Sequence, residues 1–288
     1  MEINGKTRLC GLLAYPAGHS MSPMLHSLFA ERTGANLVYC PFEVPPMGLG
    51  DAVRGAFALG VLGLNVTVPH KQHVMEFLEG IDENAARIGA VNTLVRTETG
   101  FRGYNTDYIG LKRSLQKEDM PVRGRDCILI GAGGAAKAAA CLLATEGAAR
   151  VFVLNRTVEK AEALCAYMDE IAGRKMSVGL SLEQWDQIPC GGCLAIQTTS
   201  VGMHPRTGSA PIEDPLFYQK IEAALDIVYN PSQTRFLRLT KDAGGRIANG
   251  LDMLVFQGAA SFELWNPGVQ IPEDALSEAA LRIREALS

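Results

Sequence analysis

The sequence predicts an α/β protein that consists of two α/β domains. A length of 288 residues is enough for two domains of ordinary size. Apolar runs of strand length alternate with helical patterns and Gly-rich turns along the whole chain, as in parallel β-α-β units. A new β-α-β unit begins at Asp126, after a charged segment at 117–125. We therefore expect one domain at 1–107 plus 251–288 and the other at 108–250, with a cleft between them.

Composition and charge exclude several classes of protein. A hydrophobic share of 47% and a charged share of 20% are typical of a globular chain. A net charge of −4 without a long basic run argues against nucleic acid as a partner. Met1–Arg8 is polar and no stretch approaches the roughly 20 apolar residues of a membrane span, so we expect a cytoplasmic protein that does not bind membranes.

The cysteines indicate neither disulfides nor a metal site. Their number is seven, which is odd, and they are scattered through apolar segments, as in proteins of a reducing compartment. Cys190 and Cys193 have C-x-x-C spacing, but no second Cys or His pair accompanies them. We expect no metal and no redox role.

In the first half of the chain, strands are expected at 9–14, 38–42, 63–68, 91–95 and 100–104. One helix begins at Ser22-Pro23, where Ser suits the N-cap and Pro the first helical position. Further helices are expected at 48–59, directly after Pro69, and at 108–116. In the second half, strands are expected at 127–130, 151–154, 194–198 and 224–228, and 252–288 should be helical and pack on the first domain.

A glycine-rich turn after the strand 127–130 predicts a dinucleotide site. The turn reads Gly131-Ala132-Gly133-Gly134-Ala135-Ala136 and is followed by a helical segment of small residues. In this G-x-G-x-x-A pattern the first glycine permits a tight turn, and the second lets the backbone approach a pyrophosphate. The alternative is a glycine-rich turn with no ligand.

The end of the next strand favours NADP over NAD, although NAD stays possible. An Asp or Glu that reads the ribose 2′-hydroxyl is missing, and the strand 151–154 is followed by Asn155-Arg156-Thr157. Arg156 and, one helical turn later, Lys160 can bind a 2′-phosphate. The alternative is a solvated Arg156 beside a Thr157 that caps the next helix.

Three polar segments follow strands of the first domain, where ligands bind in open α/β sheets. Ser20 and Ser22 can hydrogen-bond hydroxyl or carboxylate oxygens, although Ser22 can also be only a helix cap and His19 is expected to be structural. In the second segment, Thr67 should face opposite to Val66 and Val68. Lys71 should open a helix, where a cation opposes the helix dipole and therefore needs a carboxylate partner or a substrate.

The third segment contains Asn92, with Asn105-Thr106-Asp107 downstream. Asp107 can be a catalytic carboxylate or simply the N-cap of the helix at Tyr108.

Taken together, these motifs resemble the shikimate dehydrogenase family, including its quinate/shikimate-using members. The resemblance covers the whole chain, and the motifs occur in the family's order. They are Ser20-x-Ser22-Pro23, Asn65 to Lys71, Asn92, Asn105-Thr-Asp107, the Gly131 loop, Asn155-Arg-Thr157, Asp226 to Tyr229, and Asn249 to Gly258.

The resemblance implies a reversible, NADP-dependent reduction of 3-dehydroshikimate to shikimate in aromatic amino acid and chorismate biosynthesis. It implies Lys71 and Asp107 as the catalytic pair. It implies that the substrate is held by Ser20, Ser22, Thr67, Lys71, Asn92, Asp107, Tyr229 and Gln257. It implies that the cofactor is held by Gly131, Ala132, Gly133, Gly134, Ala135, Asn155, Arg156, Thr157, Lys160, Thr199, Ile227, Gly250 and Met253.

One departure from the family's pattern concerns the cofactor. Gln197 stands where relatives commonly have Asn, which makes the backbone contacts of 197–200 to the cofactor less certain. Three alternative functions remain open: a quinate/shikimate dehydrogenase that uses NAD or NADP, a dehydrogenase of another small metabolite, and a non-catalytic NAD(P)-sensing regulator. We expect a monomer or a homodimer.

Overall fold

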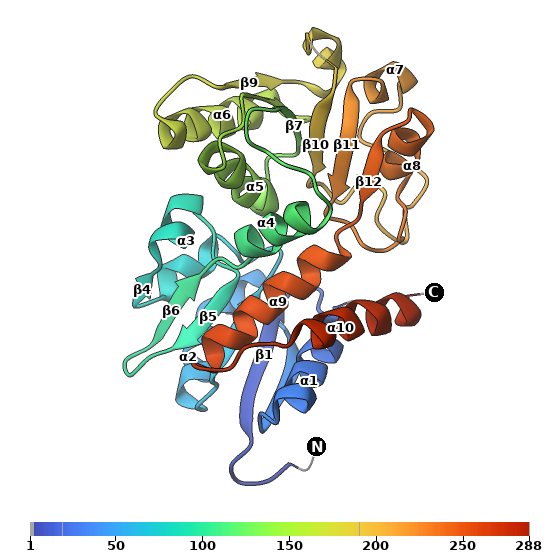
Figure 1. The fold of residues 1–288 in the computed structure, drawn as a ribbon. Coiled ribbons are helices and arrows are strands. Elements are labelled where there is room, and N and C mark those ends of the chain that lie inside the picture. The colour runs from blue at the N-terminus through green and yellow to red at the C-terminus, as the bar shows by residue number, and fades with distance from the viewer. Residues whose placement is uncertain (1–2, 19, 190, 288) are drawn as a thin grey trace. The chain divides into compact units, whose positions relative to one another are not determined.

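The computed structural model describes residues 3–18, 20–189 and 191–287, so His19 and Cys190 lie outside the described residues. The chain forms two compact units, Met1–Gly110 with Leu254–Ala286 and Leu111–Met253. The expected boundaries at 107 and 250 lie three residues before the observed ones at 110 and 253. Each unit is an α/β structure with its own six-stranded sheet (Figure 1).

The sheet of the first unit has the strand order β2-β1-β3-β5-β6-β4. Its strands are β1 (Arg8–Ala14), β2 (Leu37–Glu43), β3 (Gly63–Val66), β4 (Gly80–Ile81), β5 (Thr93–Arg96) and β6 (Phe101–Tyr104). The α-helices are α1 (Ser22–Thr33), α2 (Leu49–Ala58), α3 (Glu83–Ile88), the start of α4 (Asp107–Lys117), most of α9 (Leu251–Trp265), and α10 (Glu273–Ala286). Two 3-10 helices span Pro46–Gly48 and His73–Phe77.

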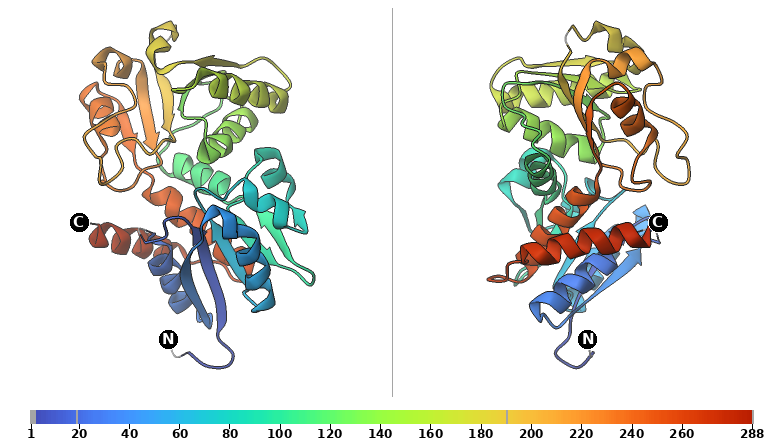
Figure 2. Two further views of the ribbon diagram at one scale, coloured as in Figure 1. Left: turned by 180° about the vertical axis from the view of Figure 1, so that it is seen from behind. Right: turned by 45° about the vertical axis from the view of Figure 1, so that its right-hand side comes forward.

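Helices α1, α9 and α10 lie together on one face of this sheet, and α2 covers the other face (Figure 2). Glycines let α9 approach its neighbours closely. A Cβ on Gly258 would lie 2.4 Å from Leu25 of α1, and one on Gly63 would lie 2.1 Å from the indole nitrogen of Trp265. That indole donates a hydrogen bond of 2.9 Å to the carbonyl of Leu94, which fixes the end of α9 to β5.

Strand directions bring four loop segments to one edge of the first sheet. β3 is parallel to β1 and antiparallel to β5, and β5 is antiparallel to β6. The carboxyl ends of β1, β3 and β6 therefore lie beside the amino end of β5. Asn65 pairs with Thr93, and Thr93 pairs in turn with Tyr104. We call this edge the site edge.

Several local expectations for the first unit were wrong. No helix follows Pro69 directly, since Lys71 lies in a turn and the next element is the 3-10 helix at His73–Phe77. The helix-dipole argument for Lys71 therefore fails. β3 ends at Val66, so strand alternation does not extend to 67–68, and Val66 is buried whereas Val68 is 70% exposed.

The α1 N-terminus also differs from the expectation. Met21 is the N-cap and Ser22 is already the first helical residue. The short strand β4 was not expected.

The second unit contains a parallel sheet of the order β12-β11-β10-β7-β8-β9. Numbered along the chain, these strands lie in the order 3-2-1-4-5-6 of a Rossmann fold. The strands are β7 (Asp126–Ile130), β8 (Arg150–Leu154), β9 (Ser177–Leu180), β10 (Cys193–Gln197), β11 (Ile221–Asp226) and β12 (Arg246–Ala248). The helices are the rest of α4, α5 (Gly134–Thr145), α6 (Val158–Ala172), a 3-10 helix at Leu182–Gln187, α7 (Pro215–Tyr218), α8 (Arg235–Asp242) and the first turn of α9.

Alternate residues of these strands face opposite sides, and one side packs on α7 and α8. Ile128 and Phe152 belong to a buried cluster with Phe217 of α7 and Phe236 of α8. The four strongly apolar strands were predicted. The short strands β9 and β12 were not.

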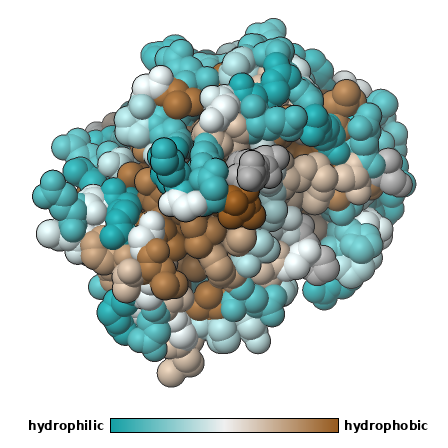
Figure 3. Space-filling model, turned by 90° about the horizontal axis from the view of Figure 1, so that it is seen from below, coloured by the Kyte–Doolittle hydropathy of each residue, from teal (hydrophilic) through white to brown (hydrophobic). Residues whose placement is uncertain are grey.

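No helix in the part of the chain that the structure describes is long and apolar enough to cross a membrane. On the face drawn in Figure 3, hydrophobic side chains form an area bordered by hydrophilic ones.

Candidate active site

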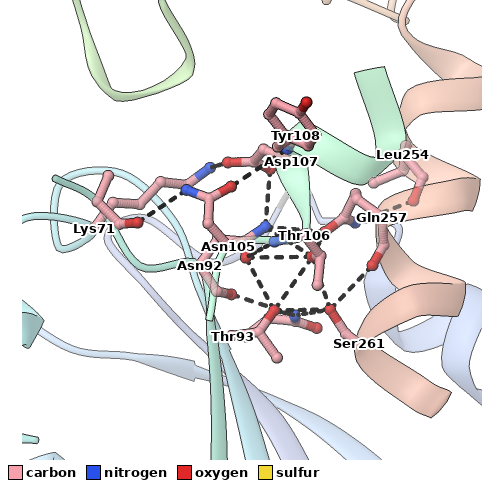
Figure 4. Close-up of polar contacts among 12 residues, drawn as sticks. Lys71, Asn92, Thr93, Asn105, Thr106, Asp107, Tyr108, Leu254, Gln257 and Ser261 are labelled. Atoms are coloured by element: carbon pink, nitrogen blue, oxygen red, sulfur yellow. Dashed lines mark hydrogen bonds and ion pairs between the residues drawn. The ribbon is translucent and has the colours of Figure 1, made fainter. Parts of the chain in front are cut away.

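A buried ion pair lies at the site edge of the first unit. Lys71 Nζ donates to Asp107 Oδ2 at 2.6 Å, and the two side chains are only 16% and 8% exposed. Lys71 follows β3 and Asp107 follows β6, so the sheet brings together two residues that are 36 positions apart. The predicted catalytic pair is thus in direct contact (Figure 4).

The turn that presents Lys71 is held at two points. The His70 ring nitrogen Nε2 lies 2.8 Å from the carbonyl oxygen of Val44, and His70 is 1% exposed. The backbone N–H of Val91 donates to the carbonyl of Lys71 at 2.8 Å. Lys71 therefore extends from an ordered turn rather than from the start of a helix. Its partner is the carboxylate of Asp107.

Asn92 holds the other oxygen of the carboxylate. Its Nδ2 donates to Asp107 Oδ1 at 2.9 Å, and its Oδ1 accepts from the backbone N–H of Thr106 at 2.7 Å. Because a backbone N–H can only donate, this contact fixes which end of the amide faces Asp107. Asp107 is the first residue of α4, and the N–H of Tyr108 is bonded by Asn105 Oδ1 at 3.4 Å. The alternative that Asp107 only caps a helix was therefore wrong.

Gln257 reaches the same group of residues from α9. Its Oε1 accepts from Asn92 Nδ2 and from the Thr106 hydroxyl, both at 3.4 Å, and the Gln257 side chain is half-buried.

Thr67 is also half-buried and lies in the loop after β3, where its N–H donates to the carbonyl of Leu13. Tyr229 belongs to the second unit, where burial raises the pKa of its hydroxyl.

The paired serines lie in the loop after β1 and at the start of α1. Ser20 Oγ accepts from the N–H of Ser22 at 3.2 Å. Ser22 is 7% exposed, it is already part of the helix, and no side chain caps the α1 N-terminus. The alternative reading of Ser22 as a helix cap was wrong.

Behind Ser22, a buried amide joins several polar groups. Asn65 Oδ1 accepts from the Tyr39 hydroxyl at 2.9 Å and lies 3.1 Å from His26 Nε2. Burial lowers the pKa of His26 to about 3, so the imidazole is neutral at pH 7 and donates from Nε2. Among the described residues His26 Nδ1 has no hydrogen-bond partner. The ring instead stacks on Tyr39, with centroids 4.3 Å apart.

The predicted cofactor residues gather at the carboxyl edge of the parallel sheet in the second unit. The Gly131 turn follows β7, beside the carboxyl end of β10, where the strand order reverses. Gly131 has φ +109°, and a Cβ there would lie 2.6 Å from the Thr198 hydroxyl. Gly133 is the N-cap of α5 and no described side chain caps this helix, so its first N–H groups are available to an anion.

The end of β8 fits a 2′-phosphate better than a 2′-hydroxyl. Arg156 and Lys160 are exposed, and Asn155 Nδ2 donates to the carbonyl of Thr157 at 2.8 Å. Thr157 is the N-cap of α6, but its side chain makes no capping bond. The donor set therefore suits the pyrophosphate and the extra phosphate of NADP.

Gln197 takes a structural role at the end of β10. It is fully buried, and its Nε2 donates to Asp226 Oδ1 at 3.2 Å and to the carbonyl of Thr199 at 3.1 Å. Its Oε1 accepts from the N–H of Thr199. Gln197, which stands in place of the family's usual Asn, thus bonds both the N–H and the carbonyl of Thr199.

Ile227, Gly250 and Met253 lie at the ends of β11 and β12 and in the first turn of α9. A Cβ on Gly250 would lie 1.9 Å from the carbonyl oxygen of Ile227, so only glycine fits. The N–H of Gly250 donates to the carbonyl of Val228 at 3.2 Å. Met253 is 7% exposed and packs in the interior of the unit.

The sequence prediction gave no role to several polar residues behind the Lys71–Asp107 pair: His26, Tyr39, Thr93 and Ser261. Thr93 and Ser261 are fully buried and bonded to each other. Ser261 has one usable signal, because it follows Gln257 by four positions on α9 and therefore lies on the same helix face.

The second unit has a Rossmann sheet with a glycine turn at its switch point, and the first unit holds a buried Lys–Asp pair. These two features define an NAD(P)-dependent oxidoreductase. Residues 12–94 match the family model of the shikimate dehydrogenase substrate binding domain, 114–184 that of shikimate / quinate 5-dehydrogenase, and 250–281 that of the shikimate 5′-dehydrogenase C-terminal domain. The chain belongs to the shikimate dehydrogenase family.

Individual proteins agree with this assignment. Shikimate dehydrogenase (NADP(+)) of Caldanaerobacter subterraneus subsp. tengcongensis is 42% identical over 267 residues, which cover 92% of this chain and 94% of that protein. A crystal structure of a shikimate dehydrogenase in complex with NADP+ is similar with a TM-score of 0.88 and 36% identity, over 100% of this chain and 98% of the other.

A similar fold also occurs in a protein that is named for a different substrate. The ligand-free structure of 5-ketofructose reductase of Gluconobacter sp. strain CHM43 has a TM-score of 0.81 and 30% identity, over 97% of this chain and 100% of that chain.

Proposed function

We propose that this protein is an NADP-dependent shikimate dehydrogenase, which reversibly reduces 3-dehydroshikimate to shikimate in aromatic amino acid and chorismate biosynthesis. The observation that carries the proposal is the Lys71–Asp107 ion pair, held by Asn92 at the edge where Ser20 and Ser22 also lie. Membership of the shikimate dehydrogenase family and the named relatives support the substrate and the cofactor.

Bound NADPH would supply the hydride for the ring carbonyl of the substrate. As the new C–H bond forms, the C=O electron pair moves to oxygen, and the ammonium of Lys71 stabilises this charge and donates a proton to it. Asp107 holds the Lys71 ammonium in place, and solvent restores the proton. In the reverse direction, neutral Lys71 takes the proton from the hydroxyl group.

The remaining residues of the proposal orient the two reactants. Ser20, Ser22 and Thr67 offer hydroxyls to the carboxylate of the substrate, and Asn92 and Gln257 offer amides to its ring hydroxyls, with Tyr229 as a further contact. On the cofactor side, the α5 N-terminus would bind the pyrophosphate, and Arg156 and Lys160 the 2′-phosphate.

A single assay separates this function from its rivals. Nicotinamide absorbance is followed with shikimate or quinate against NADP or NAD, and with 5-ketofructose against NADPH. Highest kcat/KM for shikimate with NADP supports the proposal. Preference for quinate or NAD would point to the dual-substrate alternative, and activity on 5-ketofructose alone to another small metabolite. No activity in any mixture would leave the NAD(P)-sensing regulator.

For assembly and location, we propose a cytoplasmic monomer or homodimer. Met47 and Leu59 are 97% and 82% exposed, and single apolar side chains of this kind occur on the surface of monomers as well as at subunit interfaces. Light scattering at several concentrations distinguishes one chain from two.

A further inference from the structure

Three buried hydroxyl groups meet behind the catalytic pair. Thr93 begins β5, Thr106 follows β6, and Ser261 lies on α9, and all three are 0% exposed. Ser261 Oγ lies 2.8 Å from Thr93 Oγ1 and 3.0 Å from Thr106 Oγ1, and the two threonine oxygens are 3.3 Å apart (Figure 4). We call this group the hydroxyl cluster.

The hydroxyl cluster links two buried amides. Asn65 Nδ2 donates to Ser261 Oγ at 2.9 Å on one side, and Asn92 Nδ2 donates to Thr106 Oγ1 at 3.0 Å on the other. Thr93 Oγ1 in turn donates to Asn92 Oδ1 at 3.0 Å. The cluster therefore contacts both ends of the amide that bonds Asp107.

Ser261 is the member that connects this cluster to α9. Its hydroxyl lies 3.0 Å from the carbonyl oxygen of Gln257, one turn earlier on the helix. The same turn presents Gln257 Oε1 to Asn92 and Thr106. One hydroxyl thus contacts the strand side through Asn65 and Thr93 and the helix side through Gln257.

We propose that Ser261 is a positioning residue for the reaction, which acts through Thr93, Thr106 and Asn92 on the aim of Asp107 at Lys71. The inference rests on the proposed function, because it assigns Ser261 to the same proton-transfer pair. Ser261 bonds neither member of the pair directly. Its effect must pass through the Asn92 amide, whose orientation fixes one of the two carboxylate oxygens.

Removing the hydroxyl should therefore change chemistry more than binding. In Ser261→Ala, Asn65, Thr93 and Thr106 each lose a partner although all three are buried, and they must rearrange. A misaimed Asp107 stabilises the Lys71 ammonium less well. We expect kcat for shikimate oxidation to fall about tenfold or more, with a smaller change in KM.

Three further variants separate positioning from simple loss of stability. Ser177→Ala removes another buried serine hydroxyl, which donates to Asp169 Oδ1 at 2.7 Å and lies at the amino end of β9. It should lower the melting temperature but leave kcat and the pH profile unchanged. Thr93→Val removes a second hydroxyl of the cluster, and its loss of kcat should be non-additive with that of Ser261→Ala, whereas Thr93→Ser should be close to the parent.

A second readout does not depend on turnover. Lys71 is labelled with an amine-reactive reagent in the folded protein, and its rate is followed by peptide mass spectrometry. Ser261→Ala should label several-fold faster than the parent, because a Lys71 amine that Asp107 no longer holds in place reaches the reagent more easily. Unchanged labelling of Lys71 in Ser261→Ala would overturn the inference, as would a kcat within twofold of an active parent. A parent without shikimate activity but with the labelling difference would instead overturn only the proposed function.

Discussion

The Lys71 ammonium and the Asp107 carboxylate lie 2.6 Å apart, although they come from loops after two different strands, β3 and β6. The carboxylate is held on both oxygens, since Oδ2 accepts from Lys71 and Oδ1 accepts from Asn92. A carboxylate fixed in this way can direct the lysine at a substrate atom instead of following it as a mobile counter-ion.

Replacement of Lys71 tests its role in the chemistry. Lys71→Met removes the proton and the charge but keeps most of the volume, so kcat should fall by about 10²–10⁴-fold while shikimate binding changes much less. Steady-state kinetics and a shikimate titration measure the two quantities. Lys241→Met, at an exposed lysine of α8, is the control and should be close to the parent. A kcat for Lys71→Met within tenfold of the parent would remove Lys71 from the mechanism.

The rate of alcohol oxidation should rise as the pH becomes alkaline. Oxidation requires neutral Lys71 as the proton acceptor, whereas reduction requires the ammonium, so the two directions should have opposite pH profiles. Asp107→Asn should lower the rates in both directions, because Lys71 then loses the carboxylate that aims it. Initial rates in both directions, measured from about pH 6 to about pH 11, check this prediction. A flat profile in the oxidation direction would contradict it.

Alanine substitutions at two neighbouring glycines should have different effects, one on stability and the other on NADP binding. A Cβ on Gly131 meets the Thr198 hydroxyl at 2.6 Å and φ is +109°, so Gly131→Ala should destabilise the fold even without ligand. Gly133 has nothing within 4 Å of a built Cβ, so Gly133→Ala should fold like the parent but bind NADP weakly, since the pyrophosphate must approach that backbone.

Thermal unfolding and NADP titration of both glycine variants check this difference. Normal NADP affinity in Gly133→Ala would place the pyrophosphate elsewhere.

The parts of this protein that follow from local sequence were predictable. The strand at 127–130, its glycine turn and the following helix form one continuous pattern, and the structure has β7, the turn and α5 there. The predicted helix after Pro69 was wrong because that turn is held by tertiary contacts, above all His70 to the carbonyl of Val44. Short strands such as β12, with three residues, are too brief to give a periodic signal.

The Lys71–Asp107 pair could be predicted from local motifs, whereas the residues that support it could not. Lys71 and Asp107 were identified from motifs, but the sequence provided no way to join Ser261 to them. Its three partners outside α9, which are Asn65, Thr93 and Thr106, lie 196, 168 and 155 positions away. Only the paired strands β3, β5 and β6 and the helix packed on them create that cluster.

Arg156 should decide the choice between the two nucleotides. A charge-assisted hydrogen bond contributes about 1.5–3 kcal/mol, so Arg156→Ala should raise the KM for NADP by roughly 10–100-fold. NAD has no 2′-phosphate, and its kinetics serve as the internal control because they should change little. Lys160→Ala should have the same direction with a smaller effect. Equal losses with NADP and NAD would show that Arg156 does not bind the 2′-phosphate.

Asp226 should make the second unit less stable as the pH rises through neutrality. This carboxyl is fully buried, and burial raises its pKa from 3.8 to about 7 against the hydrogen bonds from Thr234, Val228 and Gln197. A carboxyl whose folded pKa is raised holds its proton more tightly in the folded state. Its contribution to stability is therefore complete below about pH 4 and is lost as the pH rises to about 7, by a few kcal/mol at most.

Asp226→Asn tests this because an amide can replace the protonated acid. Its oxygen can accept from the N–H of Val228 and from Gln197 Nε2, and its amine can face the Thr234 hydroxyl, which now bonds Asp226 Oδ2 at 2.6 Å. The variant should melt at a higher temperature than the parent at pH 8 and at a similar temperature near pH 4.5. Melting curves of both proteins at the two pH values measure this difference. A variant that is less stable than the parent by the same amount at both pH values would mean that Asp226 is ionised in the folded protein throughout, with its hydrogen bonds outweighing the cost of burial.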